Sequence, residues 1–255
     1  MLLAIDAGNT NIVFGIHDGE KWIQEWRYNT VPVKNPIEYE MFLRLNFLES
    51  NLKMSEVTGV IISSVVPQLN SILANFWNAI IDVEHVFVGP KYYDQLPIST
   101  VSPHEIGTDL IANTMAAHTM YQADCIVVDF GTALTFTVIN ANGEIQGVNI
   151  APGLRTAIAA LVGNTAQLPE VPLELPESAI GKNTIHAIQS GVLWGYVGMV
   201  EGMLERIQKE VGKDFKVIAT GGLSSILHPL HEKFDEVNPK LTLEGLRAIH
   251  RVVTQ

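Results

Sequence analysis

"LLAIDAGNTNIVFGI" (residues 2–16) and "CIVVDFGTALTFTVI" (residues 125–139) follow one pattern in the same chain. Each is an apolar run, an aspartate, one further residue, a glycine, a two-residue step and a second apolar run. The turn between the runs is too tight for a helix, so each stretch predicts two paired strands. Asp6 and Asp129 lie 123 residues apart and each opens a similar series of elements, which predicts an internal duplication.

The segments after the two turns alternate between strands and helices. We predict a helix near Pro36–Leu52 from the spacing of Ile37, Met41, Leu45 and Leu48, and another over 106–121. The second half predicts a hairpin at "NANGE", helices over 154–162 and from Asn183, the strand "FKVIATGG" and the helix "LTLEGLRAIHRV". The expected organisation is an α/β protein with domains at residues 1–118 and 119–255.

Composition limits the classes of function. The 255 residues include 16 Lys and Arg and carry a net charge of −11, which argues against a nucleic-acid partner. No run of 18 apolar residues is present, so no membrane span is expected, and "MLLAIDAGNT" does not resemble a signal peptide. Cys125 is the only cysteine and lies in an apolar run, so we expect a buried thiol, no intrachain disulfide and a cytoplasmic location.

The chemistry of the two turns suits a nucleotide. A glycine lets backbone amides approach a phosphate closely, and the hydroxyls of Thr10 and Thr132 can donate to phosphate oxygens. Asp6 and Asp129 repel phosphate, so their natural role is to hold a cation or its waters. The alternative is that both are ordinary strand-connecting turns. "ATGG" (219–222) either supports a nucleoside or is a tight strand-to-helix turn, and no Walker A or Gly-x-Gly-x-x-Gly signature is present.

These landmarks resemble the acetate and sugar kinase, Hsc70 and actin superfamily, and within it the chain resembles the type III pantothenate kinases nearly end to end. The resembling segments are "DAGNTNIVFG" (6–15), "SSVVP" (63–67), "EIGTD" (105–109), "DFGTA" (129–133), "APG" (151–153), "GKNTIHAIQSG" (181–191), "TGG" (220–222) and "LTLEGL" (241–246). The resemblance implies two ribonuclease H-like domains of the actin-like ATPase type.

The resemblance also implies roles for individual residues. Asp109 matches the catalytic base, Asp129 a site for K⁺ or NH₄⁺, and Thr132 a phosphate contact. Thr184 would reach the substrate of a neighbouring subunit in a homodimer. The ATP phosphates would lie against Asp6, Ala7, Gly8, Asn9, Thr10, Asn11, Ile12 and Val13. The pantothenate site would be lined by Gly107, Thr108, Asp109 and Leu110.

The implied reaction is ATP-dependent phosphorylation of pantothenate to 4'-phosphopantothenate, the first step of coenzyme A synthesis, with Mg²⁺ bound to ATP. A carboxylate such as Asp109 can accept the proton of the attacking hydroxyl. Its alternative role is to complement the dipole at a helix N-terminus. Arg155 either counters phosphate charge or is an exposed helical arginine.

Two positions depart from the family pattern. Leu110 stands where the family has arginine, and Thr100 stands where it has a substrate-contacting tyrosine. Leucine offers no guanidinium to a carboxylate, so pantothenate binding is expected to be weak or the acceptor altered. Tyr92 or Tyr93 can substitute if their loop folds inward. The alternative functions are a nucleotide-binding or regulatory member with an impaired site, and a kinase for another small hydroxy acid.

Four glycines recur along the predicted helix that starts near Asn183. Gly191, Gly195, Gly198 and Gly202 are spaced by four, three and four residues and so lie along one face. Each costs about 1 kcal/mol relative to alanine in a helix interior. We therefore expect a close helix contact, either within the domain or across a dimer.

Overall fold

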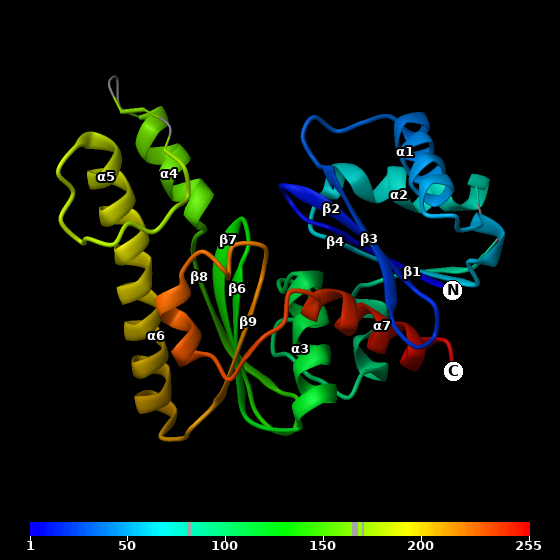
Figure 1. Cartoon of the computed structure of the whole chain (residues 1–255). Coiled ribbons are helices and arrows are strands. Elements are labelled where there is room, and N and C mark those ends of the chain that lie inside the picture. The colour runs from blue at the N-terminus through cyan, green and yellow to red at the C-terminus, as the bar shows by residue number, and fades with distance from the viewer. Residues whose placement is uncertain (81–82, 165–167, 170) are drawn as a thin grey trace. The chain divides into compact units, whose positions relative to one another are not determined.

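The computed structural model describes residues 1–80, 83–164, 168–169 and 171–255, which form two compact units. Unit 1 contains Met1–Met120 and Leu241–Gln255, and unit 2 contains Tyr121–Lys240. The sequence prediction assigned residues 119–255 to a second domain. In the structure the last helix, α7 (Leu241–Val253), packs with unit 1 (Figure 1).

Unit 1 is built on a five-stranded sheet in the order β3-β2-β1-β4-β5. Strands β1, β2 and β3 form an antiparallel meander, and β4 and β5 continue the sheet parallel to β1. The strands are β1 (Leu2–Ala7), β2 (Asn11–His17), β3 (Trp22–Asn29), β4 (Gly59–Ser64) and β5 (His85–Phe87). The helices are α1 (Pro36–Glu49), η1 (Met54–Glu56), α2 (Pro67–Ile80), η2 (Pro90–Gln95), α3 (Thr108–Tyr121) and α7.

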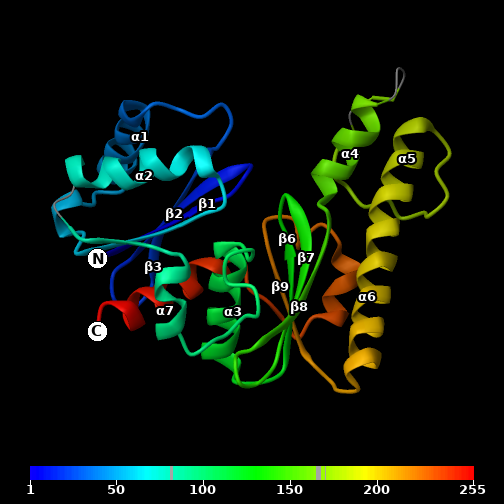
Figure 2. The same ribbon diagram turned by 180° about the vertical axis from the view of Figure 1, so that it is seen from behind.

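Unit 2 repeats this topology with the order β10-β9-β6-β7-β8. Strands β6, β7, β8 and β9 are labelled in the two opposite views of Figures 1 and 2. Its strands are β6 (Cys125–Phe130), β7 (Ala133–Ile139), β8 (Ile145–Pro152), β9 (Lys216–Thr220) and β10 (Glu236–Val237). Its helices are α4 (Leu154–Gly163), α5 (Thr184–Gln189), η3 (Ser190–Trp194), α6 (Gly195–Val211) and η4 (His228–Lys233).

The duplication extends to the register of the strands. Asp6 lies opposite Val13 on the antiparallel neighbour and beside Ser63 on the parallel neighbour. Asp129 has the same two kinds of neighbour, Thr135 and Thr220. The predicted internal duplication is therefore confirmed, with each aspartate at the same position of an equivalent sheet.

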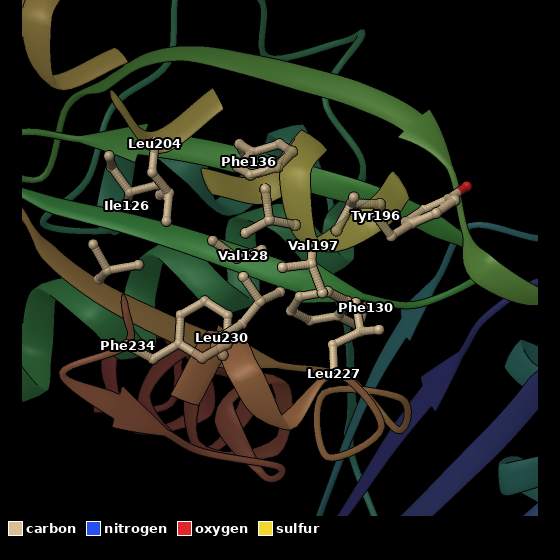
Figure 3. Packing of buried hydrophobic residues seen from close by; sticks show 14 of the residues in the cluster. Ile126, Val128, Phe130, Phe136, Tyr196, Val197, Leu204, Leu227, Leu230 and Phe234 are labelled. Atoms are coloured by element: carbon tan, nitrogen blue, oxygen red, sulfur yellow. The ribbon is translucent and has the colours of Figure 1, made fainter. Parts of the chain in front are cut away.

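The core of unit 2 shows why these strands form a sheet covered by helices. Ile126, Val128 and Phe130 alternate along β6 and point into one cluster with Phe136 of β7, as strand periodicity requires (Figure 3). Val197 and Leu204 of α6 close this cluster from the helix side. Unit 1 has an equivalent cluster centred on β1 and β2.

Helix α7 joins unit 1 through a close backbone approach. A Cβ at Gly245 would clash with the backbone of Ala112 on α3, so only glycine allows these two helices to lie this close. Trp22 Nε1 on β3 also donates to Glu244 Oε1 at 2.8 Å. These contacts join residues more than 130 positions apart, so α7 packs with unit 1 although it follows unit 2 in the sequence.

Helix α1 confirms the helix predicted near residues 36–52, but its buried face is not the one that predicted it. Asn35 and Glu38 form a capping box at its start, and Pro36 occupies the first turn. Its buried residues are Tyr39, Leu43 and Phe47, whereas Ile37, Met41, Leu45 and Leu48 are exposed.

The predicted long helix from Asn183 is present as three consecutive segments. Asn183 caps α5 by accepting from His186 N–H at 2.9 Å. A π-helical turn, η3, then leads into α6, which ends at Gly212 in the left-handed conformation (φ 71°). Among the described helices of the chain, none is long and apolar enough to cross a bilayer.

Candidate active site

The first aspartate turn joins β1 to β2 at the end of the central strand of unit 1. Gly8 N–H donates to Asn11 O at 3.0 Å, which closes the turn, and Asn9 and Thr10 are exposed at its tip. The turn thus presents backbone and hydroxyl groups to solvent, as phosphate binding requires.

Two neighbouring segments brace this turn. Thr30, which is 1% exposed, donates its hydroxyl to Gly8 O at 2.6 Å, and its N–H donates to Thr10 O at 3.0 Å. Val65 N–H donates to Ala7 O at 3.1 Å. Sequence reasoning missed Thr30, because nothing local marks the end of β3 as a partner of a turn 20 residues earlier. The turn is therefore held rigidly before any ligand binds.

The second group of predicted residues lies at the start of α3. Asp109 occupies the first turn of this helix, as predicted, and is half-buried. Thr108 Oγ1 and Ser63 Oγ of β4 lie 2.9 Å apart in a hydrogen bond, and Ser63 is fully buried. Ser63 is also the neighbour of Asp6 in the sheet. One buried side chain therefore links the first aspartate turn to the helix that carries Asp109.

The environment of Asp109 shifts its protonation. Burial raises the pKa of the Asp109 carboxyl above its usual range, and backbone N–H groups, of which Leu110 donates at 2.8 Å, oppose the shift only in part. A Cβ at Gly107 would clash with the Asp109 carboxylate, so glycine at 107 leaves room for that side chain. A carboxyl with a raised pKa is a better proton acceptor than an ordinary aspartate.

The structure shows how far Leu110 and Thr100, the two residues that depart from the family pattern, are buried. Leu110 is buried, 8% exposed, and Thr100 is half-buried. Tyr93 of η2 is also 8% exposed, and burial, followed by the charge of Asp109, raises the pKa of its hydroxyl. Tyr93 therefore packs inward, close enough to Asp109 for that charge to affect the pKa of its hydroxyl. Tyr92 instead lies beside Lys91, whose Nζ is 4.6 Å from the centroid of the tyrosine ring.

The second aspartate turn joins β6 to β7 in unit 2 and repeats the first. Gly131 N–H donates to Ala133 O at 3.0 Å, the counterpart of the bond from Gly8. Gly221 of the Thr-Gly-Gly segment has φ +90°, and a Cβ there would lie 2.6 Å from Asp129 Oδ1. "TGG" therefore packs directly on the aspartate turn, in a conformation and a space that only glycine fits.

Thr132 lies exposed in this turn, and the "APG" segment fixes its carbonyl. Gly153 N–H donates to Thr132 O at 3.0 Å, and Thr156 Oγ1 donates to the same oxygen at 2.8 Å. A Cβ on Gly153 would lie 2.5 Å from Thr132 O. Arg155, next to these residues in the first turn of α4, is exposed. The three glycine-containing motifs of unit 2 thus meet at one end of its sheet.

Thr184 is the first residue of α5 and is exposed. Gly181 packs on the backbone of Ala187, so the "GKNT" segment folds back on the helix it introduces. Ser190 Oγ donates to Ser178 O at 2.8 Å and Trp194 Nε1 donates to Pro176 O at 3.1 Å, which fixes the loop before it.

The glycine face of η3 and α6 is open. Within the described part of the chain, and apart from adjacent residues and the helix's own nearby backbone, no atom lies within 4 Å of a Cβ built on Gly191, Gly195, Gly198 or Gly202. The expected close contact within the domain is therefore not made by the described residues.

The predicted site residues fall into two sets. Residues 6–13 and 107–110 lie in unit 1, where Ser63 connects them, and Asp129, Thr132 and Thr184 lie in unit 2. Among the residues that the structure describes, no three His, Cys, Asp or Glu side chains are grouped so that they could hold a metal ion by themselves.

The fold is shared with solved structures. A putative 2-dehydro-3-deoxygalactonokinase from Sinorhizobium meliloti superposes with a TM-score of 0.59 at 11% identity, covering 99% of this chain and 97% of that one. The two duplicated sheets, each headed by an Asp-x-Gly turn, are two ribonuclease H-like domains of the actin-like type, a fold shared with MreB 5 of Spiroplasma citri at a TM-score of 0.54 and 9% identity.

Sequence comparison defines the family within this class. Residues 2–206 match the family model described as type III pantothenate kinase. Proteins named type III pantothenate kinase from Moorella thermoacetica and Myxococcus xanthus are 42% and 41% identical over 250 residues, 98% of both chains in each case. The chain belongs to the type III pantothenate kinase family.

Proposed function

We propose that this chain transfers the γ-phosphate of ATP to pantothenate, giving 4'-phosphopantothenate in the first step of coenzyme A synthesis. The observation that carries the proposal is the Ser63–Thr108 hydrogen bond of 2.9 Å. It couples the strand beside Asp6 to the helix turn that bears Asp109. Phosphoryl transfer depends mainly on such positioning of donor and acceptor and on neutralisation of charge.

In this proposal the residues of unit 1 have two roles, phosphate binding and proton acceptance. The braced turn at residues 6–13 binds the ATP phosphates through its backbone N–H groups and the Thr10 hydroxyl. Asp109 accepts the proton of the pantothenate hydroxyl as the oxygen attacks phosphorus, a contribution on the order of 10²–10⁴-fold. Its raised pKa supports this role, because the carboxylate holds a transferred proton more firmly than an exposed aspartate does.

The proposal also includes two cations. Mg²⁺ would bind mainly to phosphate oxygens and waters, which suits a hard ion and requires no cluster of protein ligands. Asp129 would hold the monovalent cation, K⁺ or NH₄⁺, and Thr132 would contact the phosphates. The fit rests on Asp129 Oδ1, which lies close to the backbone of both Gly131 and Gly221 because neither residue has a side chain there.

Pantothenate recognition is the part of the site most altered relative to the family. Leu110 cannot form the bidentate contact of an arginine with the pantothenate carboxylate, so we expect a high Michaelis constant for pantothenate. Tyr93 is the inward-facing polar side chain near Asp109 that can take part in acceptor binding. The alternatives, a kinase for another small hydroxy acid and a nucleotide-binding member with an impaired site, rest on the same two substitutions.

A homodimer is part of the proposal. The open glycine face of α6 supports it, because close helix packing is the usual compensation for glycine inside a helix. Thr184, exposed at the head of α5, would contact the substrate of the neighbouring subunit. Light scattering that gives the 28.0 kDa monomer mass at micromolar concentration would contradict it. The cytoplasmic location stays a prediction from the sequence.

The decisive experiment is a coupled kinase assay with ATP, Mg²⁺ and K⁺ across pantothenate and related hydroxy acids. Asp109→Asn should lower kcat by at least 10²-fold without raising the KM for ATP, and Asp94→Asn, an exposed carboxylate on η2, is the matched control. Turnover with another acceptor but not with pantothenate would favour a kinase for a different small hydroxy acid. Nucleotide binding without turnover of any acceptor would favour a nucleotide-binding member with an impaired site. Unchanged turnover in Asp109→Asn would exclude Asp109 as the base.

A further inference from the structure

Helix α1 carries apolar side chains on two faces, and only one is buried. Tyr39, Leu43 and Phe47 are at most 2% exposed. Four residues, named here the α1 stripe, are exposed by 66, 58, 53 and 73%: Ile37, Met41, Leu45 and Leu48. Their spacings of four, four and three place them on one face of the helix. The stripe has no function in the fold of unit 1.

The exposed area is large enough for a specific contact. Val31 and Val33, which precede the helix in the sequence, are 71 and 37% exposed. With about 120 Å² for a fully exposed aliphatic side chain, the six residues expose roughly 430 Å² of apolar surface. One side of a standard protein interface buries about 800 Å², of which a little over half is apolar, or about 450 Å².

The order of residues along α1 identifies the partner. We propose that the α1 stripe binds the α1 stripe of a second copy of this chain, with the two helices antiparallel. The pattern is nearly palindromic about residues 42 and 43. In an antiparallel pair Ile37 faces Leu48 of the second copy, and Met41 faces Leu45.

The charges beside the stripe follow the same symmetry. Glu40 and Arg44 form an ion pair of 2.7 Å within α1. In the antiparallel pair, Glu40 of each copy also faces Arg44 of the other, so the two ion pairs form an alternating cluster. Lys34 lies 3.9 Å from Glu38 at the start of the helix. The flanks of the stripe are therefore locally balanced although each chain carries a net charge of −11.

Association is tested by sedimentation velocity on the full-length protein. Met41→Glu with Leu45→Glu should halve the mass of the largest assembly, and Ile150→Glu, at a residue 72% exposed on β8, should leave it unchanged. Kinase activity is measured in parallel and should not change, so failure of the contact and failure of the proposed function are distinguishable. If α6 forms a second contact, the stripe variant should stop at the dimer made by α6, whereas the wild type forms a larger assembly.

The register has its own test. Arg44→Glu should weaken association, and adding Glu40→Arg should restore it, since opposite charges again face one another. Cysteines at Met41 and at Ile37 report the direction of the helices. With a rise of 1.5 Å per residue, equivalent positions in the two copies are offset by about 5 Å at residue 41 and about 16 Å at residue 37.

A disulfide should therefore form between copies of Met41→Cys and not of Ile37→Cys. A wild type of one copy at all concentrations, or an unchanged mass in the stripe variant, overturns the proposal. Equal cross-linking at both positions overturns the antiparallel arrangement. A stripe that binds a different protein would leave the purified chain unassociated through α1, so the stripe variant and the wild type would have the same mass.

Discussion

Replacing Gly153 by alanine tests whether close packing fixes the second aspartate turn, which joins β6 to β7 and contains Thr132. The new methyl carbon would lie 2.5 Å from Thr132 O and 2.8 Å from Thr132 C, where ordinary contacts begin near 3.4 Å. The Thr132 carbonyl must therefore retreat by about 1 Å, which also breaks the 3.0 Å bond from Gly153 N–H. Overpacking costs about 1–3 kcal/mol and the lost hydrogen bond about 1 kcal/mol.

The expected loss of about 2–4 kcal/mol corresponds to a Tm lower by roughly 5–12 °C for a chain of this size. A displacement of 1 Å at a site of phosphate contact can cost about 10²-fold in rate, so kcat/KM for ATP should fall by 10–100-fold below the transition. Differential scanning fluorimetry and the coupled assay at 20 °C measure the two effects separately.

Gly147→Ala, on the strand β8 that leads to Gly153, is the matched control. No described atom lies within 4 Å of a Cβ at Gly147, and the residue is exposed, so its stability should change by no more than about 0.5 kcal/mol. If the two variants have the same Tm and the same KM for ATP, Gly153 does not fix the Thr132 turn, and the account of that turn is wrong.

Three further predictions follow from the environments of single groups. Burial raises the folded pKa of Asp109 above its unfolded value, so its contribution to stability is present at low pH and is lost as the pH rises through the folded pKa. Asp109→Asn should thus raise the Tm at pH 7.5 and flatten its pH dependence; a lower Tm would contradict this. Ser63→Ala and Thr108→Val should each cost about 1 kcal/mol, and the double variant should cost little more than either, as urea denaturation would show. Additive losses would mean that the two hydroxyls do not interact. Burial raises the pKa of Cys125 to about 11, so Ellman's reagent at pH 8 should label it only after unfolding, and rapid labelling of the native protein would disprove its burial.

The strands and their duplication were predictable because their information is local. An apolar run, Asp-x-Gly and a second apolar run specify two strands and the turn between them, and the repeat of the pattern specifies two sheets. The unit to which α7 belongs depends on the contact of Gly245 with Ala112, which no local pattern contains. The buried face of α1 could not be predicted from the sequence either, because apolar residues occur on both of its faces.

In the candidate site too, features set by local sequence were predicted, and features set by contacts between distant segments were not. Asp109 and the two turns lie where their motifs predicted, at a helix start and at strand ends. Thr30, Ser63 and Gly153, which brace those motifs, were not predicted, although Ser63 and Gly153 lie in segments that carry the family resemblance. Their roles arise from hydrogen bonds and close approaches between distant segments, and such contacts exist only once the sheets have formed.

The membership of α7 in unit 1 has a consequence for synthesis on the ribosome. Residues 121–240, which make up all of unit 2, are synthesised before the helix that completes unit 1. Unit 1, whose first strand is made first, therefore cannot be completed until the whole of unit 2 has been translated. Until α7 arrives, the backbone of Ala112 and the buried side of α3 stay uncovered in the nascent chain, which makes this surface the natural point of contact for a chaperone.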